Sequence, residues 1–329
     1  MSPCLRGNTS LQSPNNSYFR RDQRRYDHRS MEVFTQNGKL DIRKLAKTIS
    51  VIENEENGYE ELMKSLPHRD DAKIIGITGP PGAGKSTLTD ALIADLTQKD
   101  KKIAVLCIDP SSPFNKGALL GDRIRMNEWF NNPKVYIRSL ATRGTMGGLH
   151  PKIIEIADLL KTEYFDYVII ETVGVGQTEV EIAGLADVTV VLFVPESGDE
   201  IQTMKAGLME IADVFVVNKS DRPGADAFAA NLKQLVKASA HKVQGELPVL
   251  KTVATEKQGI HELTDAIERK LKESSSSDKK VILLTEKLFH LIQRKRMQDV
   301  DKKELQKLVE KNLTSGSFNL YNLAEHHSL

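Results

Sequence analysis

Short runs of apolar, β-branched residues recur along the middle of the chain, and most are followed by a turn and a stretch with helical spacing. The strand candidates are KIIGIT (73–78), KIAVLCID (102–109), KVYIRS (134–139), YVIIET (167–172), VTVVLFVP (188–195), VFVVNK (214–219) and PVLKTV (248–253). Nearly continuous apolar runs are typical of parallel strands covered on both faces by helices. The pattern therefore predicts an α/β fold, a doubly wound, mainly parallel sheet, over residues 71–273.

Amphipathic segments flank this region on both sides. Ile42, Leu45, Ala46 and Ile49 recur at helical spacing, which predicts a helix over residues 41–52 within an N-terminal helical extension, residues 31–70. After the polar break SSSSDKK (274–280), leucines again follow one helix face, and we expect a C-terminal helical extension over residues 281–329. These last helices either fold back on the core, the simpler arrangement, or form a dimerisation arm.

Residues 1–30 are polar and Arg-rich, with no hydrophobic period, and we predict a disordered tail. An Arg-rich, acid-poor start is compatible with a mitochondrial transit peptide, with a bacterial tail, or with translation beginning at Met31. The expected location is the cytoplasm, with the mitochondrial matrix as the alternative.

Composition narrows the classes of partner. The 46 Lys and Arg nearly cancel the 45 Asp and Glu, so no charge excess indicates nucleic acid or an anionic membrane. Two cysteines are too few for a disulfide framework, and a reducing compartment fits them. The apolar runs are too short for a membrane helix, which needs about 20 residues.

The strongest chemical signal is GPPGAGKS, residues 79–86, which matches the phosphate-loop pattern and stands between a predicted strand and a predicted helix. Its glycines let successive backbone N–H groups face phosphate oxygens, and the following helix adds the positive end of its dipole. Lys85 is expected to reach the β- and γ-phosphates, and the Ser86 hydroxyl to bind Mg²⁺. A glycine-rich turn without a ligand is the weaker alternative.

A second signal, NKSD, ends the apolar run at residues 214–219. Its Asp221 carboxylate can accept the N1–H and N2–H of guanine, a donor pair that adenine lacks, so Asn218, Lys219 and Asp221 predict a GTP site. Alone, this sequence would be an ordinary polar turn.

Carboxylates after other strands are candidates for the metal shell. Glu171 and Gly174 form an E-x-x-G pattern, in which the acid meets Mg²⁺ or its water and the glycine N–H meets the γ-phosphate. Asp109 and Asp122 follow earlier elements and are candidate Mg²⁺ ligands, although either could instead cap a helix. Gln177 could orient the attacking water or simply face solvent.

These motifs, in one order with CIDPSSP, LLGDRIRM, TRGTMGGL, ETVGVGQTE and SGDEIQTMKAGLMEIAD, resemble the MeaB/ArgK family of SIMIBI-class P-loop GTPases, relatives of the human methylmalonic aciduria type A protein. The likeness runs from about Asp41 to the C-terminus. It implies a homodimeric GTPase with GTP/GDP and Mg²⁺ as cofactors. It also implies a chaperone of a cobalamin-dependent acyl-CoA mutase, typically methylmalonyl-CoA mutase, which gates adenosylcobalamin delivery and protects or reactivates the mutase.

The resemblance also implies roles for individual residues. The candidate catalytic residues are Lys85, Glu171, Gln177 and Lys205, the last on a further switch, residues 197–213, that meets the partner; the simpler reading of this segment is a core-facing helix stripe. The candidate metal residues are Ser86, Asp109, Asp122 and Glu171. The candidate nucleotide-binding residues are Gly79, Pro80, Pro81, Gly82, Ala83, Gly84, Lys85, Ser86, Thr87, Gly174, Asn218, Lys219, Asp221, Val253, Ala254 and Thr255.

Two departures from the family pattern stand out. Val253 occupies a position where the family commonly has serine, in the loop expected to contact the guanine O6, and Asn115 and Lys116 replace glycine-rich sequence before LGD.

Competing functions are a kinase of a transport system, an older label for ArgK relatives, and a metal-delivering SIMIBI GTPase. The first would need a catalytic base and an acceptor site, and the second a Cys/His cluster; neither pattern is evident in the sequence.

Overall fold

The computed structural model describes residues 41–67, 71–109, 126–142, 149–163, 165–174, 178–196, 211–239, 247–273, 278–297, 300–314 and 318–327. The predicted tail, residues 1–30, lies outside these ranges, as do Asp122, Gln177 and Lys205.

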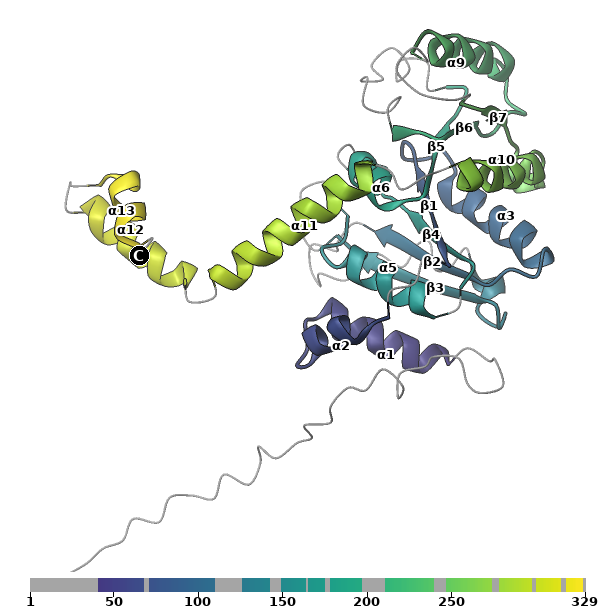
Figure 1. Ribbon diagram of the computed structural model, residues 1–329. Coiled ribbons are helices and arrows are strands. Elements are labelled where there is room, and N and C mark those ends of the chain that lie inside the picture. The colour runs from purple at the N-terminus through teal and green to yellow at the C-terminus, as the bar shows by residue number, and fades with distance from the viewer. Residues whose placement is uncertain are drawn as a thin grey trace, which may run out of the picture.

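A seven-stranded, entirely parallel sheet forms the centre of the described structure (Figure 1). Its strands are β1 (Lys73–Thr78), β2 (Ile103–Asp109), β3 (Val135–Ala141), β4 (Tyr167–Glu171), β5 (Val188–Phe193), β6 (Val214–Val217) and β7 (Val249–Lys251). Their order across the sheet is β3-β2-β4-β1-β5-β6-β7, which places β1 in the middle. The predicted doubly wound parallel sheet is confirmed.

Helices cover both faces of the sheet because successive strand residues point to opposite sides. In β5, Val190 and Leu192 pack with α3 (Lys85–Gln98) and α10 (Ile260–Glu273), whereas Val191 and Phe193 pack with α9 (Ala225–Ser239). The α9 face also carries α5 (Ile153–Thr162) and α6 (Thr178–Leu185). The described part also contains two short 3₁₀ helices, η2 (Asn127–Trp129) and η4 (Ala254–Glu256).

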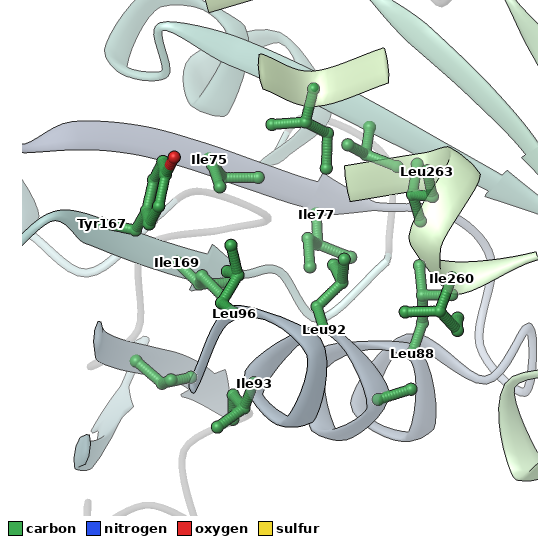
Figure 2. Packing of buried hydrophobic residues seen from close by; sticks show 14 of the residues in the cluster. Ile75, Ile77, Leu88, Leu92, Ile93, Leu96, Tyr167, Ile169, Ile260 and Leu263 are labelled. Carbon is green, nitrogen blue, oxygen red and sulfur yellow. The ribbon is translucent and has the colours of Figure 1, made fainter. Parts of the chain in front are cut away.

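The packing of α3 fixes the position of the phosphate-loop motif. Figure 2 shows Leu88, Leu92 and Leu96 of α3 pointing toward Ile77 and Ile169 of the sheet, with the start of α10 alongside. Leu88 and Leu92 are fully buried. Burial of a leucine side chain stabilises the fold by roughly 1.5–3 kcal/mol, so this row holds the helix firmly against the strand that precedes the motif.

Within the described residues, two helices precede the sheet. The predicted helix at residues 41–52 is α1 (Ile42–Glu53), which begins where the Asp41 carboxylate accepts a hydrogen bond from the Lys44 backbone N–H at 3.0 Å. Leu45 and Ile49 are fully buried in the core cluster that also contains residues of α5. A shorter helix, α2 (Tyr59–Ser65), follows.

A buried lysine joins these helices to α5. The Lys152 ammonium lies 2.6 Å from Glu55 Oε1, 3.5 Å from Glu155 Oε1 and 4.7 Å from the centre of the Tyr59 ring. Burial acts to lower the pKa of Lys152, but the Glu55 hydrogen bond and the two carboxylate charges outweigh it and raise the pKa above its usual value. Lys287, in the C-terminal helix α11 (Asp278–Arg296), also pairs with Glu155, at 3.1 Å.

The C-terminal helices are α11 (Asp278–Arg296), α12 (Lys302–Thr314) and α13 (Leu320–His327). α11 starts against α6, where a Cβ atom on Gly184 would come within 3.2 Å of the Leu283 Cβ. Further along α11, Lys295 lies 3.8 Å from Glu60 of α2, and α12 and α13 follow at the far end of the helix (Figure 1). Within the described ranges, no helix is both long enough and apolar enough to cross a membrane.

Candidate functional site

The phosphate-loop motif connects the middle strand of the sheet to α3. Gly79–Gly84 follows β1, and the helix begins at Lys85. The Lys85 ammonium donates hydrogen bonds to the carbonyl oxygens of Gly79 at 2.9 Å and Pro80 at 3.1 Å, and the side chain is buried. The lysine therefore reaches back over the loop at the N-terminal end of α3, where an anion is favoured by the helix dipole.

At two glycines in this region, any side chain would clash with neighbouring atoms. Gly84, at φ 90°, is the N-cap of α3, and a Cβ there would lie 2.5 Å from the Asn218 Nδ2. Gly174, at φ 87°, follows β4, and a Cβ there would lie 2.1 Å from the Gly79 carbonyl oxygen and 2.6 Å from the Lys85 Nζ. Both have left-handed backbones that favour glycine. The glycine that ends the E-x-x-G segment thus lies directly against the phosphate loop.

Glu171 ends β4 under the first turn of α3. Its Oε1 accepts a hydrogen bond from the Ser86 hydroxyl at 2.6 Å, and its Oε2 lies 3.1 Å from the Thr89 hydroxyl. The Glu171 side chain is 3% exposed. A buried carboxylate next to the phosphate-loop serine provides the hard oxygen ligands that a Mg²⁺ ion prefers.

Asp109 ends the neighbouring strand on the same side of the sheet. Cys107 aligns with Glu171 in the β2–β4 register, and Asp109 lies two residues further along, so its side chain points to the same face. The side chain is 4% exposed. The structure therefore places Asp109, Glu171 and Ser86 at one edge, whereas the fourth predicted metal residue, Asp122, lies outside the described residues.

The NKSD motif begins directly after β6. The Asn218 side-chain amide donates to the Ala83 carbonyl oxygen at 2.9 Å, and its Oδ1 accepts hydrogen bonds from the Thr252 hydroxyl at 3.1 Å and the Ala254 backbone N–H at 3.2 Å. This buried side chain ties the phosphate loop to the loop after β7. Sequence reasoning connected Asn218 with the base alone and did not anticipate this bridge.

The next residues of the motif point away from the core. Lys219, at φ 56°, donates from its ammonium to the Gly82 carbonyl oxygen at 2.7 Å. Asp221 is exposed in the following turn. In the loop after β7, Val253 and Ala254 are buried and Thr255 is exposed. The Val253 backbone N–H donates to the Gln258 carbonyl oxygen at 3.1 Å, which fixes the start of that loop.

The structure thus gathers the predicted phosphate-loop, carboxylate and NKSD residues at the carboxyl ends of β1, β2, β4 and β6. Open parallel sheets bind ligands at this edge. Gln177 and Lys205 lie outside the described residues, so the structure does not place them. The sequence analysis did not include Thr89 among the site residues. Its position could have indicated a role, because it stands three residues after Ser86 and therefore on the same helix face.

The fold and this arrangement, together with the GTPase family and relatives given below, define the chain as a P-loop GTPase, which binds GTP and GDP and hydrolyses GTP. A crystal structure titled "LAO/AO transport system kinase" superposes with a TM-score of 0.60 at 24% identity, covering 87% of this chain and 92% of that one. At this identity the likeness shows the fold alone.

The chain belongs to the MeaB family. The family model described as "Methylmalonyl Co-A mutase-associated GTPase MeaB" matches residues 45–315. A Pyrococcus abyssi protein, provisionally named a GTPase, is 47% identical over 240 residues, 72% of this chain and 74% of the relative. The Escherichia coli GTPase ArgK is 35% identical over 233 residues, 68% of this chain and 70% of the relative. The Caenorhabditis elegans protein "Methylmalonic aciduria type A homolog, mitochondrial" is 47% identical over 148 residues, 45% of this chain and 37% of the relative.

Proposed function

We propose that this GTPase is the chaperone of a cobalamin-dependent acyl-CoA mutase, with methylmalonyl-CoA mutase as the preferred partner. GTP binding and hydrolysis would gate adenosylcobalamin delivery and protect or reactivate the mutase. The observation that carries the proposal is the family match, which spans residues 45–315 and whose description names this mutase. The name of the Caenorhabditis elegans relative supports the same metabolic connection.

In this proposal the chain's own groups bind and orient the nucleotide. Backbone N–H groups of Gly82–Thr87 face the phosphates, and Lys85 exchanges the carbonyl oxygens of Gly79 and Pro80 for phosphate oxygens. Gly174 lies against the loop, where its N–H would meet the γ-phosphate, so the segment after it would sense hydrolysis. Gln177 and Lys205 keep their proposed roles in orienting water and in contacting the partner.

The carboxylate edge fits a magnesium ion. Ser86, Asp109 and Glu171 are oxygen donors that the sheet and α3 bring to one place, and Asp122 is the remaining proposed member of the shell. The ion, when bound, would neutralise the charge that develops on the phosphate oxygens. In the rest of the nucleotide site, Asn218, Lys219 and Asp221 would read the guanine, and residues 253–255 would approach its O6 with backbone N–H groups.

The first test measures GTP hydrolysis with and without purified methylmalonyl-CoA mutase. Coupling free energies of 1–3 kcal/mol between two sites correspond to changes of about 5- to 150-fold, so we expect GTP turnover to rise at least fivefold when the mutase is present. ATP turnover should stay at background, because adenine lacks the donor pair that Asp221 accepts. The Lys85→Ala variant sets the background rate.

Two outcomes would count against the mutase proposal. GTP turnover that is indifferent to the mutase, together with no complex by analytical ultracentrifugation, would leave the GTPase intact and remove this partner. Transfer of the γ-phosphate to a protein acceptor rather than to water would favour the kinase alternative.

Within the described ranges, no three His, Cys, Asp or Glu side chains are grouped as a metal site, so these residues lend no support to the metal-delivery alternative.

We also propose that the protein is a homodimer and that α11 forms its arm. Several large apolar side chains of this helix are exposed: Val281, Ile282, Leu284, Leu288, Phe289, Leu291 and Ile292. A helix of 19 residues is roughly 28 Å long, and a solvated monomer rarely keeps so large an apolar surface uncovered. A cavity of about 260 Å³ between α2 and α11, lined by Met63, Leu288 and Ile292 among others, continues this surface toward the core.

The Leu288→Glu substitution should separate the dimer. The side chain is 58% exposed in the single chain, so the monomer should tolerate a carboxylate there, whereas a dimer interface would bury it unpaired. We expect the dimer dissociation constant to rise by about 100-fold, measured by light scattering after size-exclusion chromatography. His290→Glu, an exposed position on the opposite side of the same helix, is the matched control. A wild-type chain that is monomeric at micromolar concentration would disprove the proposal that α11 forms a dimerisation arm.

A further inference from the structure

The first two turns of α3 present two hydroxyl groups to one carboxylate. Ser86 and Thr89 are three residues apart, so they lie on the same helix face, and that face looks onto the end of β4. The Ser86 Oγ is 2.6 Å from Glu171 Oε1, and the Thr89 Oγ1 is 3.1 Å from Glu171 Oε2. Thr89 is fully buried and Glu171 nearly so. Each carboxylate oxygen therefore has its own hydroxyl.

The Thr89 hydroxyl has one proton and two acceptors within reach. Besides Glu171 Oε2, it lies 3.0 Å from the Lys85 carbonyl oxygen of its own helix. Hydrogen bonds to an ionised acceptor are roughly twice as strong as those to a neutral one. The Lys85 carbonyl oxygen also accepts from the helix backbone, whereas a buried carboxylate oxygen left facing a hydroxyl lone pair would be destabilised. The Thr89 hydroxyl therefore donates its proton to a hydrogen bond with Glu171 Oε2.

We propose that Thr89 is a positioning residue for the GTPase reaction and that it fixes the orientation of the Glu171 carboxylate. With Oε2 held by Thr89, Oε1 is turned toward Ser86, the residue proposed to bind the nucleotide-associated Mg²⁺. Thr89 contacts neither nucleotide nor metal in this arrangement and acts through Glu171. The inference rests on the proposed metal-shell role of Glu171.

A comparison within the chain separates this role from ordinary helix packing. Thr264 in α10 is also buried, at 1% exposed, and its hydroxyl donates to the Ile260 carbonyl oxygen one turn back at 3.0 Å. The Thr89 hydroxyl also lies 3.0 Å from the carbonyl oxygen one turn back, that of Lys85, but it has Glu171 Oε2 as a second acceptor at 3.1 Å. Removing the hydroxyl from Thr264 therefore controls for the loss of a buried helix hydroxyl without touching the carboxylate.

The experiment uses the full chain with Thr89→Val, Thr89→Ser, Glu171→Gln and Thr264→Val. The first readout is the Mg²⁺ concentration that gives half-maximal GTP turnover. Loss of a hydrogen-bond partner behind a metal ligand typically costs 10- to 100-fold in metal affinity or activity, so we expect Thr89→Val to raise this concentration about tenfold or more. Thr89→Ser, which keeps the hydroxyl, should restore it to within about threefold. Thr264→Val should leave it unchanged.

The second readout is GDP binding with the metal removed by a chelator. Without metal, Thr89→Val should bind GDP within twofold of wild type, because Thr89 acts on the metal site through Glu171 and not on the phosphate loop. A Thr89→Val change made on top of Glu171→Gln should add less than twofold to the Mg²⁺ requirement. A merely structural role would instead weaken metal-free GDP binding and would add to the effect of Glu171→Gln.

The results distinguish a failure of the role proposed for Glu171 from a failure of the role proposed for Thr89 alone. If Glu171→Gln leaves the Mg²⁺ requirement unchanged, the metal-shell role of Glu171 fails and the role of Thr89 fails with it. If Glu171→Gln raises the requirement but Thr89→Val behaves like Thr264→Val, Glu171 keeps its role and the inference about Thr89 alone is overturned.

Discussion

The Lys85→Ala variant is expected to lose GTP hydrolysis by about 1000-fold or more. The Lys85 ammonium is buried in the curve of the phosphate loop, 2.9 Å from the Gly79 carbonyl oxygen, and phosphate oxygens would replace these carbonyls as its acceptors. Removing one preorganised donor from a site where charge develops commonly costs 10²- to 10³-fold, and here the donor also carries a full positive charge. Single-turnover hydrolysis of GTP at saturating Mg²⁺ measures the loss.

The matched control for this variant is Lys99→Ala. Lys99 is the C-cap of the same helix, and its ammonium pairs with Asp95 at 3.7 Å, Asp265 at 3.3 Å and Glu268 at 3.4 Å, away from the phosphate loop. We expect this variant to hydrolyse GTP within twofold of wild type. Turnover by Lys85→Ala at a comparable rate, in protein with unchanged circular dichroism, would show that the ammonium does not act on the phosphates.

Much of the fold could be predicted from the sequence because the strands are buried on both faces. KIIGIT, for example, is apolar except at its ends, and it forms β1 at residues 73–78 as predicted. Strand ends were less certain where polar residues continue a run: PVLKTV predicts residues 248–253, whereas β7 covers Val249–Lys251. The order of the strands across the sheet does not follow from hydrophobic pattern, because every strand presents a similar apolar surface to both neighbours.

The site was predictable to the extent that its chemistry is local in sequence. The loop at residues 79–86 carries its own glycines, lysine and serine, so one motif specifies a phosphate cradle. Contacts between distant segments were beyond reach: the Asn218 amide on the Ala83 carbonyl and the Thr89 hydroxyl on Glu171 join residues 135 and 82 positions apart. Such pairs arise from the register of β1, β4 and β6, which the residues of either partner alone do not reveal.

These long-range contacts connect the parts of the nucleotide site mechanically. Asn218 joins the phosphate loop to the loop at residues 252–254, and Gly174 leaves no room for a side chain between the E-x-x-G segment and Gly79. In the proposed function, a γ-phosphate contact at Gly174 would act on residues that lead in sequence to α6, and α11 packs on α6. Under this proposal, the nucleotide state would influence the C-terminal helices.

The Asp221→Asn variant is expected to exchange its preference for GTP for a preference for xanthosine triphosphate. A carboxylate accepts both N1–H and N2–H of guanine, whereas an asparagine that accepts N1–H turns its own NH₂ donor toward the guanine NH₂ group. Xanthine carries a carbonyl oxygen at that position, which accepts from the asparagine. Sites built around such hydrogen bonds discriminate strongly, so we expect GTP affinity to fall at least about 100-fold while xanthosine triphosphate turnover appears.

The control is Asp226→Asn, a change of the same chemistry five residues further along. The Asp226 carboxylate is exposed and accepts a hydrogen bond from Lys251, which lowers the pKa of Asp226. It lies on α9, outside the NKSD motif, so the nucleotide preference of this variant should match wild type. Competition of GTP and xanthosine triphosphate against a fluorescent GDP analogue measures both variants. Since Asp221 is exposed in its turn, the substitution should leave the folded structure unchanged, and an unaltered preference would therefore mean that another group reads the base.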